Sequence, residues 1–154
     1  GAEDVQLRLA ADLRSDATLR RIEGDLPLAS HHAVQLLVTY KAVCVRVTRS
    51  LCAGAAPRSW RAAADWLAKV AAGLIEATVA AAPAEPGPGR LAYWHLESSL
   101  GSQPLSALPG RGPAPALPEG SLASLSVKID LADGPWLGGG PLRVGGRAAG
   151  AWLT

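Results

Sequence analysis

The sequence predicts a mainly α fold, a helical bundle of four or five helices with a small C-terminal β-hairpin. Two periodicities lead to this class. Apolar residues between positions 27 and 82 recur at spacings of three and four, which is typical of amphipathic helices. From Leu125 to Leu131, apolar and polar residues alternate instead, which predicts a strand with one buried face. We therefore expect an α+β domain in which the helices dominate.

The chain of 154 residues is expected to form one domain, residues 3–154. Its apolar share of 49% and its charged share of 18% are those of a globular protein rather than a disordered one. Proline and glycine concentrate between the expected parts, which are a helical part 3–100, a Pro-rich loop 103–120 and a β-ribbon part 121–154.

Two short helices are expected first. The helix over 3–14 is predicted by apolar residues at every fourth position, Val5, Leu9 and Leu13. Asp16 is a suitable N-cap for a second helix, and Gly24 is a suitable end for it.

The longest expected helix covers residues 27–53. Its apolar side chains step by three or four residues, at Ala33, Leu36, Tyr40, Val43, Val47 and Leu51. A rival interpretation is a strand over 42–48, where valines alternate with other residues and β-branched side chains cluster. We favour the helix, because the longer window fits only the helical period.

A second long helix is predicted over 58–82, after Pro57. It is rich in Ala, and Trp60, Ala63 and Leu67 share one face. The two long segments have similar lengths and a short link, which favours an antiparallel helical hairpin.

Residues 91–100 are expected to form a short apolar helix. In the last third of the chain, the strand 123–131 is expected to turn at Gly134. A partner strand then begins near Leu142, with Gly138–Gly140 in the loop before it.

Cys44 and Cys52 are expected to be reduced thiols. On one helix they would lie about 12 Å apart along its axis, whereas a disulfide needs Cα atoms within about 7 Å. This favours an intracellular, cytoplasmic protein. No run reaches the roughly 18 apolar residues of a membrane-spanning helix, so no transmembrane segment is expected. The chain lacks Met and begins with Gly1, so we expect a piece of a larger protein.

Charge placement is the most informative feature for function. From Leu26 to Ala64 there is no acidic residue, while the same window holds five basic ones: Lys41, Arg46, Arg49, Arg58 and Arg61. In a helical hairpin the four arginines would form one basic patch. Such a patch suits an acidic or phosphorylated segment of another protein. The alternative is a solvated surface, neutralised by acidic residues elsewhere in the fold.

Several other function classes lack a signature. Nucleic acid is an unexpected partner, because the net charge is only +2 and no nucleic-acid-binding motif is present. The three histidines match no zinc motif. The glycines at 138–140 are followed by Pro rather than by the helix of a phosphate-binding loop. We therefore expect no catalytic residue, no metal and no cofactor.

The function predicted from these observations is a non-catalytic protein–protein interaction domain, such as an adaptor or scaffold module. It would bind its partner through a helical groove or through the basic patch. The residues predicted to bind the partner are Arg46, Arg49, Arg58, Arg61, Trp60 and Trp66.

Two further functions stay open. The first is a structural subunit that forms homo-oligomers by pairing its strand 123–131 with another chain. The second is an enzyme whose site is distributed along the sequence, for which His95, Asp65 and Glu76 are the first residues to inspect.

Overall fold

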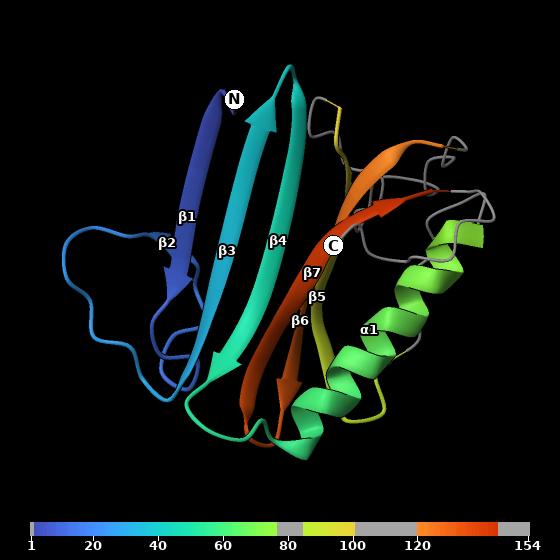
Figure 1. Ribbon diagram of the computed structural model, residues 1–154. Helices are drawn as coiled ribbons and strands as arrows, with labels where there is room; N and C mark the ends of the chain where they lie inside the picture. Colours follow the sequence, from blue (N-terminus) through green and yellow to red (C-terminus); the bar gives the residue numbers. More distant parts are fainter. Residues whose placement is uncertain (1, 77–84, 101–119, 145–154) are drawn as a thin grey trace.

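The computed structural model describes residues 2–76, 85–100 and 120–144, which form one antiparallel sheet and one helix (Figure 1). The predicted helical bundle is therefore wrong, since the described chain is mainly β. The elements follow in the order β1 (Asp4–Ala10), β2 (Arg20–Arg21), β3 (His31–Tyr40), β4 (Val43–Cys52), α1 (Arg58–Glu76), β5 (Gly89–Ser98), β6 (Leu122–Leu131) and β7 (Gly134–Arg143).

The sheet consists of two antiparallel halves, β1–β4 and β5–β7, that meet in the middle. Its strand order is β2-β1-β3-β4-β7-β6-β5, so the N-terminal strands join the C-terminal ones where β4 pairs with β7. The sheet also curls. Just after β5, Leu100 bridges Val43, and the Cys44 N–H donates to the Ser99 carbonyl at 2.7 Å. The end of β5 thus returns to the start of β4, and one face of β4 lies inside the curl.

The predicted helix over 27–53 is a β-hairpin, and the rival strand interpretation of 42–48 is confirmed within β4. The strands β3 and β4 pair over their full length, from His31–Cys52 to Tyr40–Val43. Lys41 and Ala42 form the turn with φ angles of 46° and 63°. Positive φ at both turn residues is the geometry of a two-residue hairpin whose twist matches that of the strands.

The turn explains why this hairpin has a helical spacing. Side chains on one face of β3 occupy even positions, and the two-residue turn moves the same face of β4 to odd positions. Reading along that face gives the positions 36, 40, 43, 47 and 51, whose steps of three and four equal those of a helix. The intervening residues Val34, Val38 and Val45, on the same face, are the evidence for strands.

The two predicted N-terminal helices and the predicted helix over 91–100 are also strands or irregular chain. Apolar residues alternate at Val5, Leu7 and Leu9 in β1, and β2 has only two residues. In β5 the register shifts between Leu91 and Tyr93, so a bulge inserts one residue. The bulge breaks the period of two that would have identified β5 as a strand.

Two predictions are confirmed. The helix predicted over 58–82 is α1, which the structure describes as far as Glu76. The strand predicted over 123–131 is β6. Its partner β7 begins at Gly134 rather than near Leu142, so the three central glycines belong to a strand. Most of the expected loop 103–120, the end of the expected helix (77–82) and residues 145–154 lie outside the described residues.

Helix α1 packs on the C-terminal half of the sheet. Its buried face repeats at Trp60, Ala63, Leu67 and Ala71, each at most 5% exposed. The opposing core side chains come from β6 and β7, namely Leu125, Val127, Ile129 and Trp136. The first turn of α1 is fixed where the Ser59 hydroxyl donates to Asp133 Oδ2 at 2.6 Å. Within the described chain, no helix has the length and apolar character that crossing a bilayer requires.

The glycines of β7 are dictated by close packing. The indole ring of Trp136 lies over Gly138, where a Cβ atom would collide with its six-membered ring. At Gly139 a Cβ atom would collide with the carbonyl oxygen of Leu125 in β6. Gly138 therefore makes room for the Trp136 ring, and Gly139 allows β7 to lie close to β6.

The core position of Ala63 yields a stability prediction. It is fully buried between α1 and the sheet, so Ala63→Leu should lower the free energy of unfolding by about 1–3 kcal/mol through overpacking. The neighbouring Ala62 is exposed, and Ala62→Leu should change the stability by less than about 0.5 kcal/mol. Urea unfolding followed by tryptophan fluorescence measures both. Equal losses for the two variants would contradict the packing of α1 described above.

Candidate ligand pocket

A pocket of about 290 Å³ lies between α1, β7 and β4. It exists because β4 and β7 pair at only two positions, Thr48–Gly139 and Arg49–Gly138, and α1 covers β7 from one side. We call it the Trp–Arg pocket. The residues that line it are Thr48, Arg49, Ser50, Ala56, Trp60, Arg61, Ala64, Leu67, Trp136, Leu137, Gly138 and Gly139.

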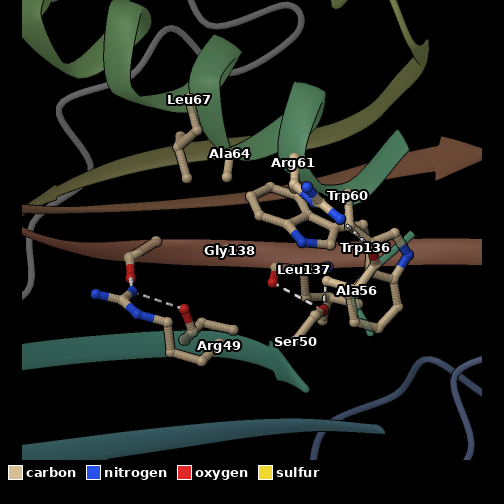
Figure 2. A pocket seen from close by; sticks show the side chains of 12 residues that line it. Arg49, Ser50, Ala56, Trp60, Arg61, Ala64, Leu67, Trp136, Leu137 and Gly138 are labelled. Atoms are coloured by element: carbon tan, nitrogen blue, oxygen red, sulfur yellow. Dashed lines mark hydrogen bonds between the residues drawn. The ribbon is translucent and has the colours of Figure 1, made fainter. Parts of the chain in front are cut away.

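The pocket has an apolar wall on the helix side. Figure 2 shows Leu67, Ala64 and Arg61 projecting from α1 toward β7, with Arg49 and Ser50 on the opposite side. Ser50 fixes the end of β4 to β7, since its hydroxyl donates to the Leu137 carbonyl at 2.9 Å and accepts the Leu137 N–H at 2.8 Å.

Trp60 contributes a buried donor as well as apolar surface. The residue is 4% exposed, and its indole Nε1 has no hydrogen-bond partner among the described residues. The ring of His31 lies 5.0 Å from it, centroid to centroid, and His31 Nδ1 is also without a partner there. A buried N–H without a partner is costly, so an acceptor brought by a ligand or by water would stabilise this end of the pocket.

Two guanidinium groups flank the apolar wall. Arg49 Nη1 donates to the carbonyls of Thr48 and Gly139, the first at 2.9 Å, which fixes the group across the strand junction. Arg61 Nη2 donates to the Ala56 carbonyl at 3.4 Å. Neither arginine has a carboxylate partner in the described part of the chain, and the lining includes no acidic residue. The pocket therefore combines aromatic surface with two positive charges that are not neutralised.

The structure brings together three of the six residues predicted to bind a partner, Trp60, Arg49 and Arg61. Trp66 packs against the hydrophobic core instead, half-buried. Arg58 is exposed at the start of α1 and does not line the pocket. The predicted helical groove is absent from the described chain, which contains a single helix.

Arg46 is separated from the other arginines because its segment is a strand. Positions 46 and 49 differ by an odd number, so their side chains point to opposite faces of β4. Arg46 points into the curl and forms an ion pair with Glu97 at 3.2 Å. The backbone N–H of Arg46 donates to the Ser124 hydroxyl at 3.2 Å. The single basic patch predicted from the sequence is thus divided between two sides of the sheet.

The inside of the curl holds a small charged cluster. His95 Nε2 lies 3.5 Å from Glu97 Oε2, and the Tyr93 ring stacks on His95 at 6.1 Å. Burial raises the pKa of Tyr93; the Arg46 charge acts to lower it, and the Glu97 charge acts to raise it. Of the residues considered for an enzyme, His95 lies in this cluster while Asp65 is exposed on α1. The side chain of Glu76 lies outside the described set.

The described residues form no cluster of metal-ligating side chains. No group of three His, Cys, Asp or Glu side chains there is close enough to hold a metal ion. Cys44 and Cys52 are free and half-buried at opposite ends of β4.

Sequence reasoning missed the contribution of β7 to the pocket. Trp136, Gly138 and Gly140 alternate, which is the pattern of an aromatic ring that covers glycines on one face of a strand. That signal was obscured by the run of three glycines, which is equally typical of a loop.

The ion pair in the curl yields a second stability prediction. The Glu97 side chain is 8% exposed and the Arg46 side chain 22%. Glu97→Gln leaves Arg46 without its counter-charge, so the free energy of unfolding should fall by about 2–3 kcal/mol. Denaturant unfolding at neutral pH measures this, with Glu3→Gln at the exposed N-terminal end as the matched control. An unchanged midpoint for Glu97→Gln would show that the pair contributes nothing.

No protein-family model, no curated protein and no solved structure matches this chain.

Proposed function

We propose that the chain is a non-catalytic interaction domain that binds an acidic segment of another protein in the Trp–Arg pocket. The observation that carries the proposal is the pair of guanidinium groups, Arg49 and Arg61, beside a pocket with two tryptophans and without an acidic lining residue. Tryptophan and arginine are the residue types most enriched at binding hot spots.

The size of the pocket favours one inserted side chain over a whole metabolite. Its volume of about 290 Å³ lies at the lower end of the range of about 300–1,000 Å³ for small-molecule sites. An aromatic or leucine side chain would contact Trp60, Trp136 and Leu67 there. The rest of the partner segment would then lie across the opening, where the two arginines are.

The arginines favour carboxylates on the flanking residues of that segment. A guanidinium group has five N–H donors, and Arg49 uses one nitrogen, Nη1, for the two carbonyls of the strand junction. Those hydrogen bonds hold the group in place, so its other donors are pre-organised for an anion. The buried Trp60 Nε1 would in addition suit a backbone carbonyl of the inserted residue.

The first prediction for this site uses acidic peptides as probes. A peptide Glu-Glu-Phe-Glu-Glu should bind at least about 10-fold more tightly than Lys-Lys-Phe-Lys-Lys, because only the first pairs with the arginines. It should also bind more tightly than Glu-Glu-Ala-Glu-Glu, which leaves the pocket empty. Titration calorimetry measures the affinities, and added salt should weaken the favoured complex. Equal binding of the acidic and basic peptides would contradict the proposal.

Variants of the arginines test the location. Arg61→Gln should weaken the Glu-Glu-Phe-Glu-Glu complex by about 10-fold or more, since a hydrogen bond to a charged group contributes about 1.5–3 kcal/mol. Arg61 makes only one long hydrogen bond within the fold, so its loss should leave the stability nearly unchanged. Arg58→Gln is the matched control, because Arg58 is exposed on the same helix outside the pocket. A similar loss for both variants would mean that the peptide is held by the net charge rather than in the pocket.

A further inference from the structure

One side of the N-terminal half of the sheet is apolar and exposed. Leu7, Leu36 and Val47 are consecutive partners across β1, β3 and β4. We call the side of these three strands on which they lie the Leu36 face. Val5 is 58% exposed on this face, Leu7 45% and Leu36 38%.

In these strands the apolar side chains face outward and the polar ones inward, which is the reverse of a usual antiparallel sheet with one solvated face. Polar side chains alternate with the apolar ones and point away from the Leu36 face, toward the interior. Gln35 is buried there and donates to the Thr48 hydroxyl at 3.0 Å, and Arg46 pairs with Glu97. The side chains on the outside of β3 and β4, by contrast, are almost all Val, Leu or Tyr.

No described helix or strand covers the Leu36 face, on which only Leu9, near the end of β1, is buried at 8% exposure. Helix α1 packs on β6 and β7, and Figure 1 shows it lying along these strands, away from β1 and β3. The Trp–Arg pocket separates it from β4. A sheet that is apolar on one side normally buries that side against a second layer. Contiguous exposed apolar patches of this kind mark interaction surfaces.

We infer that the Leu36 face is the contact between two copies of this chain, packed sheet on sheet about a twofold axis. Its charge pattern favours a second copy over a different partner. No acidic side chain lies on the face. Its one full charge is Arg49, at the β4 margin, where the side chain donates to Gly139 of β7, so the rest of the face has no charge that selects a partner of opposite charge. An uncharged apolar surface is complementary to itself, as an isologous dimer requires.

The size of the face is consistent with such a dimer. Strands of seven, ten and ten residues, at about 3.4 Å per residue and about 4.8 Å between strands, give a footprint of about 440 Å² per copy. Two copies together therefore bury about 900 Å². This exceeds the size of most crystal-packing contacts, below about 800 Å², and lies near the lower limit of about 1,000 Å² for a specific interface. We therefore expect a reversible dimer with a dissociation constant in the micromolar range.

The axis is placed near Leu36 by the arrangement of the strands. β3 is the middle strand of the three, and Leu36 lies near the middle of β3. An axis perpendicular to the strands brings the two Leu36 side chains together and places the two Arg49 side chains on opposite sides of the axis, along the β4 margin. The proposed dimer does not depend on the ligand of the Trp–Arg pocket.

Analytical ultracentrifugation from about 1 μM to about 200 μM protein tests the dimer. The wild type should shift from monomer to dimer over this range. Leu36→Asp should weaken the association at least about 100-fold, because a carboxylate would be buried without a partner. Leu28→Asp is the control, because Leu28 is 53% exposed in the loop before β3 and lies on none of the three strands. It should dimerise like the wild type.

A charge-pair experiment separates contact from simple destabilisation. Leu36→Asp and Leu36→Lys should each be monomeric alone, with the circular dichroism of the folded domain, and an equimolar mixture should form the dimer. A mixture that stays monomeric would overturn the twofold contact at Leu36. So would a wild type that is monomeric at every concentration. A monomer that co-sediments with phosphatidylcholine vesicles would assign the face to lipid instead and would equally overturn the dimer.

Discussion

The junction of β4 with β7 is the contact on which the rest of the structure depends. Only the pairs Thr48–Gly139 and Arg49–Gly138 join the two halves of the sheet there. Arg49 reinforces the junction by donating to the carbonyls of both strands. The two glycines have a separate role, since Gly138 makes room for the Trp136 ring and Gly139 allows close contact with β6. The same short pairing leaves the space beneath α1 that becomes the Trp–Arg pocket. The architecture and the binding site therefore both depend on this short pairing of β4 with β7.

The spacing of apolar residues predicted the elements in which one spacing is kept from end to end. It failed where a turn or a bulge shifts the apolar residues by one position. The strand β6 alternates without interruption and α1 keeps its helical spacing, so both could be recognised. In the β3–β4 hairpin, the two-residue turn shifts the apolar set from even to odd positions, and the bulge does the same within β5. A shift of one residue adds one step of three to a period of two, and counting every second residue of each strand gives steps of four. In β3 and β4, the β-branched residues between the helical positions are what separates the shifted strand pattern from a helix.

The candidate site could be predicted in part for the same reason. The window without acidic residues contains Arg49 and Arg61, which the fold places in the lining of one pocket, although the predicted helical hairpin is wrong. It could not separate Arg46, because a helix places positions 46 and 49 on one side and a strand places them on opposite sides. The ion pair of Arg46 with Glu97 joins residues from different halves of the sheet, and a contact between such distant positions leaves no pattern in the local sequence. The function of the pocket itself rests on chemistry that only the fold brings together.

The strands that meet at the central junction are far apart in the sequence, and this affects the order in which the fold forms. The β3–β4 hairpin and the β6–β7 hairpin each close over a two-residue turn, so their contacts are local and quick to form. Arg49 and Gly139, by contrast, are 90 positions apart. Closing so large a loop costs entropy before any contact offsets it, which slows folds dominated by distant pairings. We therefore expect the two halves of the sheet to form first as separate units. The pairing of β4 with β7 at Gly138 and Gly139 would then be the late and rate-limiting event.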